Sequence, residues 1–111
     1  MSDDDAAPIV SSLAGDTTQL ERLERFVVAL GERIDRLQDL ETARDRKQLE
    51  AEARSLGYEA SQLGYPALAE AAAAIERACA AAGPPGVVRE SVVALTDVAR
   101  RVRLGHRFTG L

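Results

Sequence analysis

The stretch LERLERFVVALGERIDRL, residues 20–37, repeats its apolar side chains every three or four positions. Such spacing is typical of an amphipathic α-helix, because residues three and four apart lie on the same side. Phe26 widens an apolar stripe that consists of Leu20, Leu23, Val27, Leu30, Ile34 and Leu37. We therefore predict a helix over about residues 18–42, with Asp16 or Thr17 as its N-cap.

The same period recurs in three later segments, which we expect to be helices over about 46–63, 66–82 and 87–104. Their side chains predicted to face inward are Leu49, Ala53, Leu56, Ala60 and Leu63 in the first, Leu68, Ala72, Ile75 and Cys79 in the second, and Val88, Val92, Leu95, Ala99 and Val102 in the third.

Glycine and proline mark the breaks between these segments. Gly64, the run 83–86 and Gly105 are expected to end the three helices in turn, because glycine readily adopts the left-handed backbone that stops a helix. Asp45 is the expected N-cap of the helix over 46–63, and Gln48 stands three residues on, as in a capping box.

Four amphipathic helices joined by short connections bury their stripes most simply against one another. We therefore predict an all-α fold: an antiparallel up-down-up-down four-helix bundle over residues 7–104, with a short N-terminal accessory helix at about 7–13. Residues 1–6 are expected to be disordered, and residues 105–111 to form a flexible basic tail.

Composition argues against several classes of function. The formal net charge is −4, and the last twelve residues contribute four arginines and no acid, so residues 1–99 sum to −8. Because phosphate backbones require a basic face, we expect no nucleic-acid partner.

The single cysteine, Cys79, cannot form an internal disulfide, and no Cys/His cluster would hold a metal. No apolar run is long enough to span a membrane, and no signal peptide is recognisable, so a cytoplasmic protein is expected.

Motifs for covalent chemistry are equally sparse. Neither Gly-x-Gly-x-x-Gly nor Gly-x-x-x-x-Gly-Lys occurs, and one histidine cannot supply the Glu-x-x-His pairs of a di-iron bundle. We therefore expect no cofactor and no enzymatic activity. His106 is the one imidazole that could accept a phosphoryl group, but we expect it beyond the last helix, without the rigid setting that such a site needs.

Residues 53–70 read ARSLGYEASQLGYPALAE. This stretch resembles the signature of histidine-containing phosphotransfer (HPt) domains, roughly Ala-His-x-Leu-Lys-Gly-x-Ala, then Leu-Gly, then a Leu-Ala helix start. The matching residues are Ala53, Leu56, Ala60, Leu63, Gly64, Leu68 and Ala69. Leu13-Ala14-Gly15-Asp16, Leu20, Phe26-Val27 and Asp45 also fit, so the resemblance covers about residues 9–104.

The chain departs from this family at the positions where the family carries phosphate. The phosphoacceptor histidine is replaced by Arg54, the lysine three residues later by Gly57, and the glycine after it by Tyr58. A guanidinium stays protonated and offers only donors, so it cannot attack an aspartyl phosphate as a neutral imidazole does. Tyr58 puts an aromatic ring where the family leaves space for a receiver domain.

The resemblance implies a degenerate HPt-like module that binds a response-regulator receiver domain or a histidine kinase without accepting phosphate. The candidate docking residues share one outward helix face: Lys47, Glu50, Arg54, Gly57, Tyr58 and Ser61. We expect Arg54, Gly57 and Tyr58 all to face solvent, so that Arg54→His, Gly57→Lys and Tyr58→Gly together would leave the fold intact.

Three alternatives to this docking module remain open. In the first, Arg54 is simply a solvated helix residue left after loss of function. In the second, the chain is a true phosphotransfer enzyme with His106 as the acceptor. In the third, the chain is a structural or dimerising helical module with no phosphorelay role, in which the alanine-rich run from Ala67 to Ala82 provides close self-association.

Overall fold

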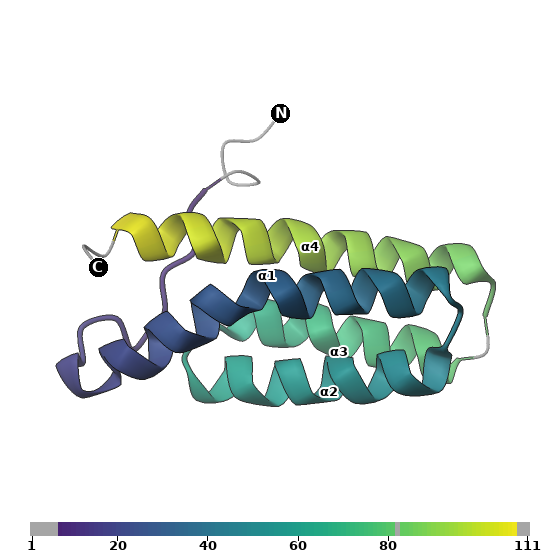
Figure 1. Cartoon of the computed structure of the whole chain (residues 1–111), viewed down its shortest axis with the longest axis horizontal. Helices are drawn as coiled ribbons and strands as arrows, with labels where there is room; N and C mark the ends of the chain where they lie inside the picture. The colour runs from purple at the N-terminus through teal and green to yellow at the C-terminus, as the bar shows by residue number, and fades with distance from the viewer. Residues whose placement is uncertain (1–6, 82, 109–111) are drawn as a thin grey trace.

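The computed structural model describes residues 7–81 and 83–108, and within them the regular structure is entirely helical. The helices are α1 (Leu20–Thr42), α2 (Arg46–Gln62), α3 (Pro66–Ala80) and α4 (Pro85–Phe108), and a 3-10 turn, η2 (Thr17–Gln19), precedes α1. Successive helices run in opposite directions and lie side by side (Figure 1). The prediction of an all-α, up-down-up-down four-helix bundle is confirmed.

The helix stripes meet in one aliphatic core. Of the side chains predicted to face inward, Leu20 is half-buried and all the others are buried. Tyr65, at the start of α3, joins them at 2% exposure and stacks on Phe26 with ring centroids 5.8 Å apart. Burial raises the pKa of the Tyr65 phenol. Tyr65 had no place in the predicted core, because it lies in a turn, where helical period gives no signal.

The turns between helices follow the expected chemistry at two positions. The Asp45 carboxylate accepts a hydrogen bond from the Gln48 amide at 3.1 Å, which caps α2. Gly64 has φ +79°, the left-handed conformation expected at the end of α2. The turn between α1 and α2 lies where it was predicted, between residues 42 and 46, but its left-handed residue, Arg44 with φ +57°, was not predicted.

The accessory helix predicted at 7–13 is wrong, because residues 7–11 have no regular structure. Their polar groups bond to distant elements instead. The Ile9 amide donates to the Arg101 carbonyl at 3.0 Å, and the Arg101 Nε donates to the Ala7 carbonyl at 2.8 Å. The Ser12 amide donates to the Gly64 carbonyl at 2.9 Å. Residues 7–12, the N-terminal segment, thus tie α4 to the α2–α3 turn, and Figure 1 shows the path of this segment across α4.

The prediction that the last helix ends at Gly105 is also wrong, since α4 continues to Phe108. Gly105 is buried where the N-terminal segment crosses α4, and a Cβ atom added there would lie 2.0 Å from the Ile9 carbonyl oxygen. The glycine therefore permits a close approach of two backbones. The first four residues of the predicted flexible tail, 105–108, belong to α4 instead, whereas its last three, 109–111, and the predicted disorder of residues 1–6 lie outside the described residues.

Across the part of the chain that the structure describes, no helix combines the length and the apolar character needed to cross a bilayer.

Gly105→Ala should lower the free energy of unfolding by about 1–3 kcal/mol, because the methyl group displaces the backbone at Ile9. Gly86→Ala is the matched control on the same helix, since a Cβ there meets nothing within 4 Å. Urea unfolding followed by circular dichroism measures both variants. Equal stability of the two variants would show that the N-terminal segment does not pack against Gly105.

Candidate functional site

The helices α2 and α3 approach each other closely through small side chains. A Cβ atom added at Gly57 would lie 3.1 Å from the Ala72 Cβ and 3.6 Å from the Ala69 carbonyl oxygen. Ala53 and Ala60, one turn to either side of Gly57, are fully buried, as is Ala72. Because none of these residues extends beyond a methyl group, the two backbones come close together.

The close packing of α2 against α3 shows that Gly57 does not lie where it was expected. The residue is half-buried and its missing side chain would point toward α3, so the expectation that position 57 faces solvent is wrong. The angular position along α2 was correctly read, but α3 covers that edge of the helix. A lysine at 57 would have to move its Cβ away from Ala72, so the triple variant with Arg54→His and Tyr58→Gly would not be structurally neutral.

Arg54 is exposed and joins α2 to α3. Its Nε lies 3.0 Å from Glu76 Oε1 on α3, and its Nη2 lies 3.0 Å from Glu50 Oε1 one turn back on α2. The hydrogen bond and charge of Glu76, followed by those of Glu50, raise the pKa of Arg54 above its already high value. The guanidinium is therefore protonated. Its positive charge is more than balanced by the two carboxylates of Glu50 and Glu76.

The remaining candidate residues line the same side of α2 at different distances from Arg54. Tyr58, one turn further along the helix, is 70% exposed. Ser61 is also exposed, and so is Lys47 in the first turn. Lys47 and Tyr58 are eleven positions apart, or about 16 Å along a helix. The structure thus brings Glu50, Arg54 and Tyr58 together with Glu76, and leaves Lys47 at the other end of the face.

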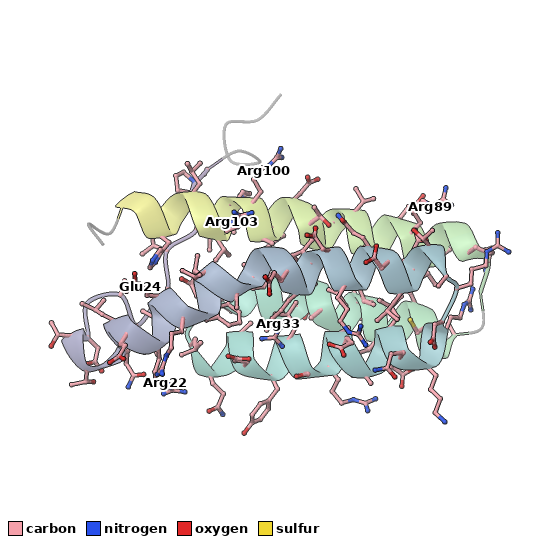
Figure 2. The ribbon with its side chains drawn as sticks, viewed as in Figure 1. Arg22, Glu24, Arg33, Arg89, Arg100 and Arg103 are labelled. Carbon is pink, nitrogen blue, oxygen red and sulfur yellow. The ribbon has the colours of Figure 1, made fainter. Side chains whose placement is uncertain are left out.

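A second set of ion pairs fixes the other edge of α2 against α1. Arg33 Nη1 lies 2.6 Å from Glu59 Oε2, and Arg36 Nε lies 3.1 Å from Glu52 Oε1. The Arg33 guanidinium also lies over the Phe26 ring, 5.9 Å from its centroid. Figure 2 shows the Arg33 side chain at the boundary between α1 and α2. Tyr58 therefore stands on a helix held at both edges.

His106 lies within α4 rather than in a tail, so the position predicted for it is wrong. The residue is half-buried and faces a small pocket whose other walls include Ser11, Leu23 and Tyr65. This pocket lies beside the N-terminal segment, whereas Arg54 and Tyr58 lie on α2. The structure brings no histidine to the candidate face.

The described residues offer no ready centre for metal or thiol chemistry. Among them, no group of three histidine, cysteine, aspartate or glutamate side chains is arranged to hold a metal ion. Cys79 is buried on α3, and burial raises the pKa of its thiol, which favours the unreactive protonated form. The cysteine therefore packs as a small apolar side chain.

Sequence reasoning identified Glu50 but missed Glu76, the second carboxylate of this site. Glu76 lies on α3, twenty-two residues from Arg54, and no periodicity within one helix shows which residues of two helices will meet. The signal that existed was the alanine content of α3, which indicates a close approach to a neighbouring helix without saying to which one.

Gly57→Leu should lower the free energy of unfolding by about 1–3 kcal/mol, because the new side chain must displace Ala72. Tyr58→Leu introduces the same residue at the next, exposed position and should change stability by no more than about 0.5 kcal/mol. Chemical denaturation of both variants tests this difference. A Gly57→Leu variant as stable as Tyr58→Leu would contradict the close approach of α2 and α3.

Comparison with known proteins gives no match: no family model fits the chain, and neither a curated protein nor a solved structure is significantly similar to it. The resemblance to HPt domains therefore stays a prediction that rests on the residues of the chain itself, and no family is assigned.

Proposed function

We propose that the chain is a non-phosphorylatable, HPt-like binding module that docks a response-regulator receiver domain through the α2–α3 face. The observation that carries the proposal is the exposed ring of Tyr58, one turn beyond Arg54, on a four-helix bundle. Arg54 stands where the resembling family has its phosphoacceptor. An exposed tyrosine is a frequent anchor of interfaces, because its ring buries a large area at a low cost in conformational entropy.

The charges around Arg54 argue against transfer of phosphate at this position. The guanidinium has no lone pair to attack an aspartyl phosphate. Glu50 and Glu76 each lie 3.0 Å from it, so an incoming phosphoryl group would have to compete with two carboxylates for the same donors. The three side chains together carry one net negative charge, which disfavours an anion at this position. Binding without phosphorylation is the outcome that this chemistry supports.

The same charges refine how a partner would dock. Arg54 is already paired, so it is not a free cation for the acidic pocket of a receiver domain. Tyr58 then provides the buried centre of the interface, and the Arg54–Glu50–Glu76 cluster provides a polar rim that fixes orientation. Rim ion pairs of this kind contribute little affinity but select the partner.

The alternative of a dimerising module loses part of the observation that motivated it. The alanines of α3 were its basis, and Ala72 packs against Gly57 within the same chain. An intramolecular contact thus accounts for Ala72, whereas Ala67, Ala80 and Ala81 are exposed.

The proposal is tested by titrating isotope-labelled protein with receiver domains encoded in the source genome and following amide shifts by NMR. We expect saturable shifts in residues 54–61 of α2 and in the facing part of α3. Tyr58→Ala should weaken binding about 30-fold, which corresponds to about 2 kcal/mol. Val93→Ala removes an exposed apolar side chain from α4 and is the matched control.

Two results would contradict the proposal. One is the absence of shifts with every receiver domain at millimolar concentration. The other is equal weakening by Tyr58→Ala and Val93→Ala. Incubation with phosphorylated receiver should leave the wild-type chain unlabelled, and a phosphoramidate that disappears in His106→Ala would instead support the enzyme alternative.

A further inference from the structure

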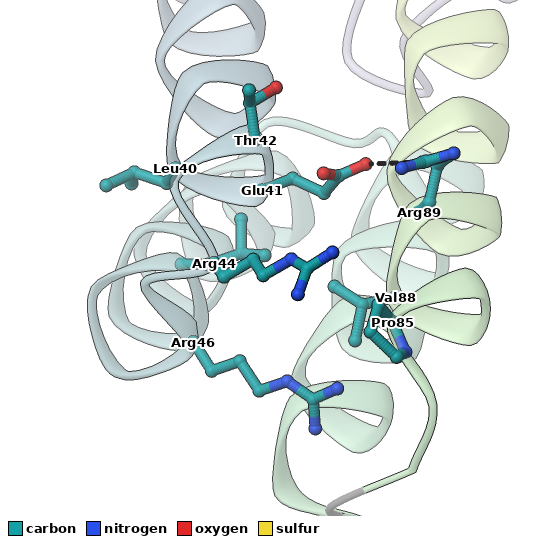
Figure 3. Close-up of a pocket in the computed structure, with 9 residues that line it drawn as sticks. Leu40, Glu41, Thr42, Arg44, Arg46, Pro85, Val88 and Arg89 are labelled. Atoms are coloured by element: carbon teal, nitrogen blue, oxygen red, sulfur yellow. Dashed lines mark hydrogen bonds and ion pairs between the residues drawn. The ribbon is translucent and has the colours of Figure 1, made fainter.

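A pocket of about 310 Å³ opens at the end of the bundle where α1 ends and where α2 and α4 begin. Figure 3 shows three arginines around it: Arg44 from the α1–α2 turn, Arg46 from the first turn of α2, and Arg89 from the start of α4. Leu49, Pro85 and Val88 supply apolar walls. The pocket therefore combines guanidinium groups with an apolar surface, in a chain whose net charge is −4.

The positive charges of this pocket are only partly balanced. Arg89 Nε lies 3.2 Å from Glu41 Oε1, and the Glu41 side chain is 16% exposed. The Arg46 Nη2 donates to the Gly83 carbonyl at 2.6 Å, which holds the guanidinium in place without cancelling its charge. Within residues 7–81 and 83–108, the Arg44 side chain has neither an ion pair nor a hydrogen bond. One carboxylate thus faces three cations.

The backbone of Arg44 gives an independent reason to assign it a role. Its φ of +57° lies in the left-handed region, where a side chain is unfavourable and glycine is the usual residue. The hydrogen bonds of the turn run from the Arg44 amide to Glu41 and from the Asp45 amide to Leu40, both at 3.0 Å, and they would form equally well with glycine at 44. The turn therefore gains nothing from an arginine, whereas the pocket does: in Figure 3 its guanidinium reaches across toward Val88.

We propose that this pocket binds a small phosphate monoester with an apolar body. Two uncompensated guanidinium groups match the two charges of a phosphate monoester, and their planar donor pairs suit its oxygens. The volume exceeds the needs of the phosphate alone and falls at the lower end of small-molecule sites, so an apolar group fits against Leu49, Pro85 and Val88. The site is separate from Tyr58, which lies twelve residues beyond Arg46, or about 18 Å along α2.

Titration with phenyl phosphate, followed by amide NMR shifts, tests this proposal. We expect saturable shifts confined to residues 40–49 and 83–89, weaker binding of inorganic phosphate, and no binding of phenol. The Arg44→Gly variant removes the guanidinium and relieves the backbone, so its melting temperature should equal or exceed that of the wild type. Its affinity for phenyl phosphate should fall at least tenfold.

Arg100→Gln is the matched control for net charge, because Arg100 is an exposed arginine of α4 outside the pocket (Figure 2). It should leave the affinity within about twofold of the wild type, whereas Arg46→Gln should lower it as Arg44→Gly does. The proposal is overturned if phenyl phosphate gives no saturable shifts, if Arg44→Gly binds it as tightly as the wild type, or if Arg100→Gln weakens it equally.

Discussion

The close contact between α2 and α3, where Gly57 meets Ala72, sets the geometry on which the candidate face depends. Larger side chains at these positions would separate the helices and move Glu76 out of reach of Arg54. With the helices close, Arg54 bridges them and its charge is used within the chain. Tyr58, the residue after Gly57 on α2, is exposed to solvent. A packing constraint inside the bundle thus decides which side chains remain available to a partner.

The helices and their inward faces could be predicted from the sequence, because period and capping are local properties. The stripe from Leu23 to Leu37 and the cap at Asp45 are where local chemistry places them. The errors arise where distant backbones meet. The N-terminal segment bonds to Arg101 and Gly64 instead of forming a helix, and Gly105 serves that crossing rather than a helix end. A glycine that permits a close approach and a glycine that stops a helix look the same in a sequence.

In the candidate site, too, the local features could be predicted from the sequence, and the contacts between distant segments could not. Exposure of Arg54 and Tyr58 could be predicted from their angle on α2, but the same angle placed Gly57 in solvent, because the position of α3 was unknown. Arg44 and Arg46 carried no functional signal, since a pocket between three helix ends belongs to the tertiary structure. The bundle therefore has two separate surfaces: a face centred on Tyr58, whose Arg54–Glu50–Glu76 cluster carries one net negative charge, and a basic pocket at one end. We propose a protein partner for the first and a small anion for the second.

The contact between Gly57 and Ala72, on which the geometry of the candidate face depends, is tested most directly by one NMR measurement. In a nuclear Overhauser spectrum of the wild-type chain, the α-protons of Gly57 should give a strong cross-peak to the methyl protons of Ala72. The absence of that cross-peak, with both residues assigned and α2 and α3 helical, would contradict the account: the helices would lie further apart, and Arg54 would no longer be held by Glu76.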